Sequence, residues 1–529
     1  MSDARSLFAL GAALCVGLGA PFARADGSDE HARTSQTTHD PAPGTFVADD
    51  WLRSFRETYA AGEKPHRREP HYLRAGLEQL IVLAAGTTYY WVRPEPNKAD
   101  WDYSSLGDRM ANLEVTFDTN LHVTNSLLHP IAGGLYYGFA RVNGLSIPAA
   151  FAYSAATSAA FEFLLEIYEK PSINDLILTP TGGMTMGEFF LHLGEYASSA
   201  PGGGKWGHKA ASWVLGMPQH LHMGEPFSAG KLEMPADSLG FSSFYTHRFA
   251  TLLGVARSTS EDGRIGDSLD LRLEGELAAV PGLLRPGRFG FTFSDGNFTE
   301  TRMHFARGHG TGLSVDVFFD ANLAGLYRQN VGVVDGVRRG SAMMLAVDSS
   351  LKFSERRLGN RYDAYAVANL IGPAFKLWAV YGDLVATLDG ATQPDFASIY
   401  SIAFSQWATQ FGTEGTKSVL QKEAYYYAYG WSGRLRGTVA YRGVELGSRA
   451  FFGTYGSIDR WDRFQENVTR DPHLTDQVTE LEAWIGLTTP TIPFHGRIFA
   501  EHFGRHGNME SVSMGRWDRR VGIMLGAQF

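Results

Sequence analysis

The strongest constraint on the fold is a two-residue alternation at the C-terminal end of the chain. Between Trp517 and Phe529, the odd-numbered positions apart from Arg519 form an apolar face topped by the tryptophan, and the even-numbered positions apart from Met524 are polar or small. Successive side chains of an extended strand point to opposite sides. One side of this strand therefore suits lipid and the other a wet interior, which is the pattern of a membrane β-barrel strand.

The same period continues through the sequence from about residue 240. In 269–277 every second residue is charged, and in 313–323 apolar residues alternate with a largely polar set. Charged side chains are costly in hydrocarbon, so we expect them to point into the lumen. The aromatic residues of 425–431 share one face and predict an interfacial girdle that leads into a lipid-facing strand.

These patterns predict a mainly β protein with an antiparallel transmembrane β-barrel over residues 240–529. We expect about twelve strands, with an uncertainty of about two either way. The segment 383–412 is ambiguous, because it also suits a helix or a long loop. The composition favours a barrel, with 60 glycines, 13% aromatic and 19% charged residues. A soluble β-sandwich shares the alternation and is the alternative.

The N-terminal end predicts export. Residues 1–25 have a positive start at Arg5, a short apolar run and the small-x-small sequence Ala23-Arg24-Ala25, as in a signal peptide. Residues 26–65 form a polar lead that we expect to be disordered. Cys15 is the only cysteine, so a mature chain would have neither disulfides nor thiolate chemistry. Phe529 resembles the signal by which bacterial outer-membrane proteins are recognised, which predicts the outer-membrane insertion machinery as a partner.

Residues 66–226 differ from the rest and predict a helical module rich in small residues. The start of 72–92, the Ala- and Ser-rich segment 147–168 and the segment 182–196 are helical in composition, whereas 112–123 alternates more like a strand. Small residues allow helices to approach closely. The sequence leaves open whether these helices plug the barrel or lie below it in the periplasm.

A polar stripe runs along the predicted helix 147–168. Ser154, Ser158, Glu162 and Glu166 follow one another at i, i+4 steps. Acids on so apolar a helix need partners, because burying an unpaired charge is expensive. The obvious candidates are Arg141 and His129. The stripe is either an acid–base or metal site or a polar seam that orients the helices.

Three further motifs carry polar side chains. Ser172 and Asp175 have the spacing of a helix cap. Glu188 and His192, at i, i+4, can bind a metal or relay a proton, although such a pair is more often structural. His220 and His222 lie in a Pro/Gly-rich linker and are a weak metal motif. We expect no metal and no cofactor.

The succession of these residues resembles a known family. His129-Pro130, Tyr136-Tyr137, Arg141 and Gly144 are followed by Ser158 and Phe161-Glu162, then by Pro171-Ser172, Asn174-Asp175, Gly182-Gly183 and Gly187-Glu188. Over residues 112–200 this set is similar to the bacterial envelope family called domain of unknown function 3943, with Phe161 where a tryptophan is more usual. The resemblance implies an outer-membrane setting and no known activity.

Three functions remain open. The first is an outer-membrane barrel for envelope structure, or for passage or binding of a lipid or small solute. The second is a membrane-embedded enzyme that modifies lipid or lipopolysaccharide, and the third is a scaffold for another envelope protein. An enzyme would use Glu162 or Glu188 as base, His129 as acid and Arg141 to hold an anionic head group. Candidate binding residues are Tyr137, Ser158, Asn174, Asp175 and His192. We expect outer-membrane lipid as a partner, and no nucleic acid, since the chain lacks basic runs.

Overall fold

The computed structural model describes most of the chain beyond residue 68. The described residues are 69–92, 106–112, 114–166, 170–200, 204–224, 236–280, 282–308, 312–358, 361–459, 468–489 and 492–529. The predicted signal peptide (1–25) and polar lead (26–65) lie outside them.

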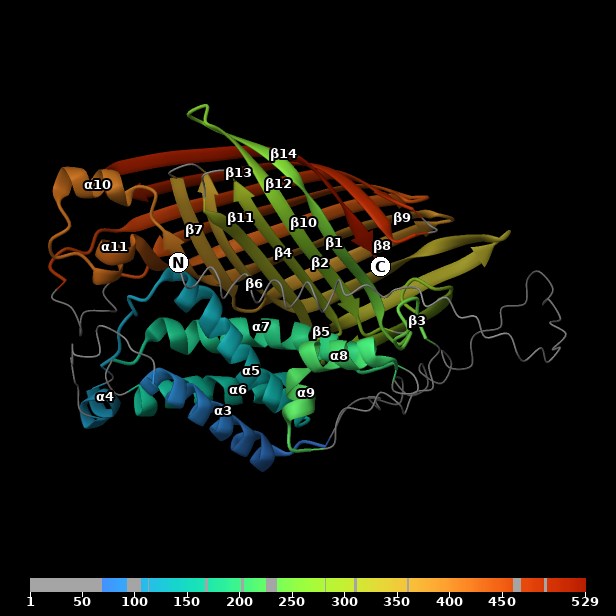
Figure 1. Ribbon diagram of the computed structural model, residues 1–529, viewed down its shortest axis with the longest axis horizontal. Helices are drawn as coiled ribbons and strands as arrows, with labels where there is room; N and C mark the ends of the chain where they lie inside the picture. Colours follow the sequence, from blue (N-terminus) through green and yellow to red (C-terminus); the bar gives the residue numbers. More distant parts are fainter. Residues whose placement is uncertain are drawn as a thin grey trace.

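A closed antiparallel β-barrel forms the C-terminal part, as predicted (Figure 1). The fourteen strands of the described residues occupy twelve positions around the barrel, because β3 and β4 pair in succession with β5, and β7 and β8 pair in succession with β6. The last strand closes the ring by pairing with the first. The strands are β1 (Thr246–Ser260), β2 (Ile265–Ala278), β3 (Gly287–Phe293), β4 (Phe298–Gly308), β5 (Leu313–Val334), β6 (Val337–Leu358), β7 (Arg361–Asn369), β8 (Gly372–Tyr381), β9 (Leu384–Tyr400), β10 (Tyr425–Tyr441), β11 (Val444–Ser457), β12 (Leu474–Thr488), β13 (Phe494–Met509) and β14 (Val512–Gln528).

The ambiguous segment 383–412 holds both a strand and a helix. It contains β9 and then α10 (Phe404–Phe411), and α11 (Ser418–Glu423) follows in the same connection between β9 and β10. The long connection therefore follows the strand rather than replacing it.

The two faces of the barrel wall differ as the alternation predicts. Cross-strand pairs such as Arg272 with His304 and Glu274 with Arg302 place charges on the inner face. Leu253 and Leu525, which pair on the outer face, are about half exposed. An apolar outer wall and a charged interior are the two faces of a transmembrane barrel.

Helices occupy the N-terminal region. They are α3 (Tyr72–Val92), α4 (Leu106–Asn112), the π-helical turn η1 (Thr124–Leu128), α5 (His129–Val142), α6 (Ile147–Ala160), the π-helical turn η2 (Phe161–Leu165), α7 (Ile173–Ala197), α8 (Trp206–Leu215) and α9 (Met217–Leu221). Within the residues that the structure describes, no helix combines the length and the apolar composition needed to cross a membrane.

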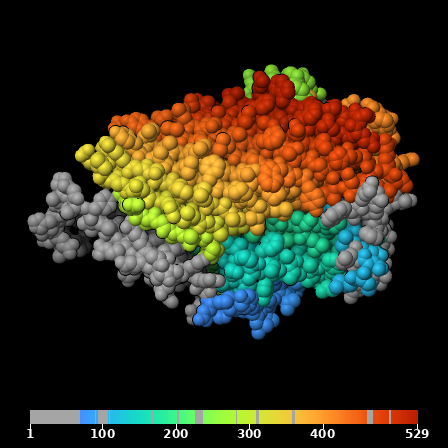
Figure 2. Space-filling view, turned by 180° about the vertical axis from the view of Figure 1, so that it is seen from behind, coloured from blue at the N-terminus to red at the C-terminus, as the bar shows by residue number. Residues whose placement is uncertain are grey.

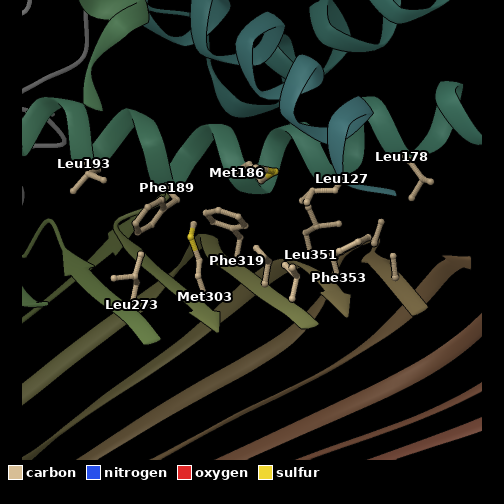
Figure 3. Close-up of a cluster of buried hydrophobic side chains, with 14 of the residues drawn as sticks. Leu127, Leu178, Met186, Phe189, Leu193, Leu273, Met303, Phe319, Leu351 and Phe353 are labelled. Carbon is tan, nitrogen blue, oxygen red and sulfur yellow. The ribbon is translucent and has the colours of Figure 1, made fainter. Parts of the chain in front are cut away.

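These helices pack as a layer along the outer wall of the barrel (Figure 1). Helix α7 lies against the wall, and its Phe189 meets the outward-facing Phe319 of β5 with ring centroids 5.6 Å apart (Figure 3). The largest buried cluster of the described residues joins this helix to β2, β4, β5, β6, β7, β9 and β10. The helical module is therefore neither a plug nor a separate body below the barrel.

Two glycines bring α5 and α7 into backbone contact. A Cβ atom on Gly183 would lie 2.4 Å from the carbonyl carbon of Gly133, and one on Gly133 would lie 1.8 Å from the carbonyl oxygen of Thr179. Since Cβ atoms do not approach other atoms so closely, both positions require glycine. The predicted close helix approach is present here, and it ties the module together.

Two local predictions are wrong. The described residues of 112–123 form no strand: Thr116 makes a single bridge to Ser172, and a helix begins shortly afterwards. Helix α7 begins at Ile173 rather than at 182 and continues through Pro180. The Ser172 hydroxyl accepts a hydrogen bond from the backbone N–H of Asp175, so this predicted cap starts the long helix.

Candidate functional site

A buried ion pair joins the two central helices of the module. The Arg141 guanidinium of α5 donates from Nε to Glu188 Oε1 of α7 at 2.5 Å, and the Tyr137 hydroxyl donates to the same oxygen at 2.5 Å. Arg141 Nη1 donates to the carbonyl oxygen of Leu145 at 2.7 Å. Tyr137 and Glu188 are fully buried. Sequence reasoning singled out all three site residues, but proposed Glu162 and Glu166 as the acids near Arg141.

The barrel also contacts this ion pair, through the residues that connect β3 and β4. His192 Nε2 lies 2.7 Å from the carbonyl oxygen of Asp295 and 3.5 Å from Glu188 Oε2. A Cβ atom on Gly296, whose φ is 65°, would lie 2.3 Å from Glu188 Oε2. The turn Asp295-Gly296 therefore brings barrel backbone against the helical ion pair.

This arrangement suits a structural role better than catalysis. The carboxylate of Glu188 is held by Arg141 and Tyr137 and has no exposed surface. A general base must reach the proton that it removes. The predicted pair of Glu188 and His192 forms, and His192 is turned toward the barrel backbone.

A second, more open cluster lies at the N-terminal end of α7. Asp118, His129 and Asp175 each offer a ligand atom, and these atoms lie within 4.8 Å of one another. His129 Nδ1 is 3.7 Å from Asp175 Oδ1, and His129 is a quarter exposed. One imidazole and two carboxylates could hold a divalent cation or exchange protons.

Asparagine and serine side chains fix this cluster. Asn174 accepts from the backbone N–H of Asp118 at 2.9 Å and donates to Asp175 Oδ1 at 2.8 Å. Ser158 donates to the backbone carbonyl of Asp175 at 3.1 Å. Glu162 accepts from the backbone N–H of Ser172 at 2.8 Å. Ser158 and Glu162 of the predicted polar stripe therefore support the start of α7, and the acid that pairs with Arg141 is Glu188.

Asp118 was missed by sequence reasoning. Burial, reinforced by the charge of Asp175, raises the pKa of Asp118 to about 6. Its Oδ1 accepts from the backbone N–H of Asn120 at 2.9 Å. The Asp-x-Asn spacing is a local turn motif, and this was the only signal in the sequence.

The other predicted histidines remain apart from both clusters. His220 Nε2 lies 2.6 Å from the hydroxyl of Ser212, and its ring stacks on Trp213. His222 Nδ1 lies 3.8 Å from Glu78 on α3. The two rings thus have separate partners.

Charged side chains cross the interior of the barrel. Arg272 bridges Glu482 and Glu501 at 2.5 Å each, and Arg434 bridges Asp320 at 2.6 Å and Asp348 at 2.9 Å. Similar contacts join further strands across the barrel: Arg497 to Glu274, Lys352 to Glu480, and Arg436 to Glu276, Glu300 and Asp389. Cavities between the inward-facing side chains measure about 70, 110 and 80 Å³.

Solved outer-membrane proteins are among the similar structures. A loop-deletion mutant of OmpT from Vibrio cholerae is 8% identical, with a TM-score of 0.21, over 54% of this chain and 99% of its own. The translocator domain of the autotransporter NalP from Neisseria meningitidis is 12% identical, with a TM-score of 0.18, over 53% and 87%. OprD from Pseudomonas aeruginosa is 7% identical, with a TM-score of 0.14, over 54% and 93%. The barrel assignment rests on this chain's own strand pairing.

The family comparison concerns the helical module. None of the curated proteins matches the sequence. The matched segment includes both the Arg141–Glu188 pair and the Asp118, His129 and Asp175 cluster. Residues 114–217 match the family described as Domain of unknown function (DUF3943), which confirms the resemblance seen in the sequence.

Proposed function

We propose that this protein is an exported outer-membrane barrel that does not conduct and that serves envelope structure by anchoring the helical module. The observation that carries the proposal is the interior of the barrel, where ion pairs join opposite parts of the wall. The cavities found between these side chains are small, at about 70, 80 and 110 Å³.

The ion pairs also support a closed interior. Arg272 is 2% exposed and contacts two glutamates on different strands. Removing one member of a buried pair leaves the other charge uncompensated, so such a network resists rearrangement. Its geometry supports a fixed core rather than a path for solutes.

Conductance in planar lipid bilayers tests this proposal. The wild-type protein should show no steady channel current. The double variant Arg272→Ala/Glu482→Ala removes two side chains that fill the interior and should admit ions. Arg257→Ala, which removes an exposed pair with Asp267 at the end of the barrel, is the matched control and should stay closed. A steady current through the wild-type protein, unchanged in the double variant, would instead favour solute passage.

A lipid-modifying enzyme is a second candidate, favoured by the cluster of Asp118, His129 and Asp175. A carboxyl group with a pKa near 6 beside a partly exposed imidazole is suited to proton transfer. The catalytic assignment then moves from Glu188, which is fully buried, to His129 and Asp118.

Mass spectrometry of outer-membrane lipids separates the two candidates. Cells with the wild-type protein, a deletion, or Asp118→Asn at matched folded levels should have the same lipid and lipopolysaccharide profile if the protein is structural. A species that changes in both the deletion and the Asp118→Asn strain would favour the enzyme, and purified protein should then reproduce the conversion.

A further inference from the structure

Helix α3 has the opposite polarity to a helix on a water-soluble protein. Its side away from the barrel carries Leu73, Leu77, Leu80 and Ile81, which are between 47% and 80% exposed. Figure 2 shows α3, in blue, on the outer side of the helical layer. A surface helix in water turns its apolar stripe inward and its charges outward.

The two charged side chains of α3 and its Gln79 point into the module. Arg74 Nε donates to Asn143 Oδ1 at 2.5 Å, and Asn143 Nδ2 donates to Glu78 Oε2 at 2.5 Å. Gln79 donates to the carbonyl oxygen of Tyr136 at 3.1 Å. Arg74 and Glu78 are the only charged residues of this helix. Its outer face therefore carries no charge.

The neighbouring elements continue this surface. On α6 the polar Ser154, Thr157 and Ser158 are buried, whereas Pro148, Ala152 and Ala156 are exposed. Large apolar side chains are also exposed on η2, on α8, on α9 and just after α9. They are Leu164, Trp206, Trp213, Val214, Met217, Leu221 and Met223. Lys205 and Lys209, at α8, are exposed as well. Exposed large apolar side chains in such number mark contact with a partner or a membrane.

The barrel wall under the helices carries outward-facing polar side chains that contact the module. Its outward-facing Ser349 lies 2.8 Å from the Thr185 hydroxyl, and Ser398 lies 2.5 Å from Ser126. Ser349 also donates to the carbonyl oxygen of Asn369 in the wall at 3.2 Å, so the helices add a second polar partner to it. Where the helices end, the apolar outer wall begins.

This boundary is visible along single strands. On β6, the exposed Leu345 and Val347 precede the covered Ser349 and Leu351 on the same face. The helices thus occupy the place of lipid on one side of the barrel.

We propose that the outer face of α3, with the adjoining apolar surface of η2, α8 and α9, contacts the acyl chains of bilayer lipids. The module would then lie beside the barrel within the membrane, its polar groups shielded between helices and wall. The proposal rests on the membrane placement of the barrel under the proposed function. It goes further in placing the module at the same depth, since the helices cover the outer face of β6 next to its exposed Leu345 and Val347.

Spin labels on single cysteines test the surface. In a Cys15→Ser background, Leu80→Cys reports α3 in vesicles of phosphatidylethanolamine and phosphatidylglycerol. Leu435→Cys, on the exposed outer face of β10, is the lipid reference, Gln410→Cys on α10 is the aqueous reference, and the buried Leu83→Cys is the protein-interior reference. Two quenchers distinguish the environments: molecular oxygen concentrates in lipid, whereas a water-soluble nickel complex stays in the aqueous phase. Collision rates with both quenchers are measured.

The label at Leu80 should have an oxygen-to-nickel collision ratio several-fold above that at Gln410 and close to that at Leu435. Ala84→Cys, exposed on the same face, repeats the measurement if Leu80→Cys folds poorly. Nickel contact at Leu80 as strong as at Gln410, or low rates for both quenchers as at Leu83, would overturn the proposal while leaving the barrel in the membrane. Nickel contact at Leu435 as well would overturn the membrane placement itself.

Discussion

At the scale of single residues, the Arg141–Glu188 pair is the strongest test of how the module is held. Glu188→Gln keeps the shape of the side chain and removes the charge that Arg141 faces at 2.5 Å. Because Arg141 is then buried without a counter-charge, the free energy of unfolding of the module should fall by about 3–5 kcal/mol. Urea titration in vesicles measures this free energy, with protease cleavage within residues 114–217 as the readout of unfolding.

Glu114→Gln is the matched control for this prediction. Glu114 lies 3.9 Å from Lys170, and both side chains are partly exposed. A pair of this kind contributes less than about 1 kcal/mol. Equal losses in the two glutamine variants would show that burial of the Arg141–Glu188 pair does not stabilise the module.

Asp118 should make the stability of the module depend on pH. The folded protein holds the proton of this carboxyl group up to about pH 6, whereas the unfolded chain releases it near 3.8. Between these values the folded state binds more protons, so stability should fall as pH rises and level off above pH 6. Asp118→Asn should lose this part of the pH dependence.

Thermal unfolding of the module between pH 4 and pH 8, followed by tryptophan fluorescence, measures the difference between the wild-type protein and Asp118→Asn. Glu114→Gln, close by in the chain, should retain the wild-type profile. An unchanged profile in Asp118→Asn would place the titrating group elsewhere, with His129 and Asp175 as the neighbouring titratable groups.

At the scale of elements, the crossing of α5 over α7 depends on glycine. Gly183→Ala places a methyl group 2.4 Å from the Gly133 carbonyl carbon, so the helices must separate. We expect a loss of about 1–3 kcal/mol in the stability of the module, as for overpacked cores. The same urea titration measures it.

Gly86→Ala provides the matched control, because its Cβ would meet only the Phe161 ring at 3.9 Å. Alanine is the better helix former by about 1 kcal/mol, so this variant should be neutral or more stable. A neutral result for Gly183→Ala as well would mean that the two helices do not cross as closely as described.

The elements also show which parts of the fold can be predicted from sequence. A barrel strand carries its own signature, since lipid and lumen impose opposite chemistry on alternate residues, as in β14. Helix α7 carries no such clear start, because the Ser172 cap and Pro180 give conflicting local signals. Glu188 and Arg141 meet across 47 residues, and no local pattern specifies that pairing.

At the scale of the whole molecule, the position of the helices on the barrel could not be predicted, because no local pattern specifies which part of the wall they cover. The outward-facing Phe319 and Leu351 are as apolar under the helices as Leu435 is in the exposed belt. The alternation shows which side chains of a strand face outward. It does not show what covers them, because lipid and an apolar helix surface both favour apolar outward-facing residues. Polar outward residues such as Ser349 and Ser398, where lipid would be expected, were the available signal.

The aromatic face of β10 tests how the module and the barrel depend on each other. It was predicted as a single girdle, but Tyr427 is 3% exposed beneath the module, whereas Tyr429, next on the same face, is 45% exposed. The Tyr427 ring stacks on Phe117 with centroids 4.7 Å apart, and its hydroxyl accepts from Asn125 at 2.9 Å. Tyr427→Ala should therefore loosen the module by about 3–5 kcal/mol, the cost of deleting a buried aromatic ring.

Tyr429→Ala removes the same side chain two positions along the same face and should leave the module as stable as in the wild-type protein. Limited proteolysis of both variants in vesicles, with urea titration, compares cleavage within residues 114–217, while the heat-modifiable mobility of the barrel in gels reports its folding. We expect protease resistance to be lost in the Tyr427 variant alone, with the barrel still folded, because the helices are held in place by contacts with the barrel wall. Equal protease resistance in the two variants would mean that this wall does not hold the module, and that the α5–α7 crossing alone keeps it folded.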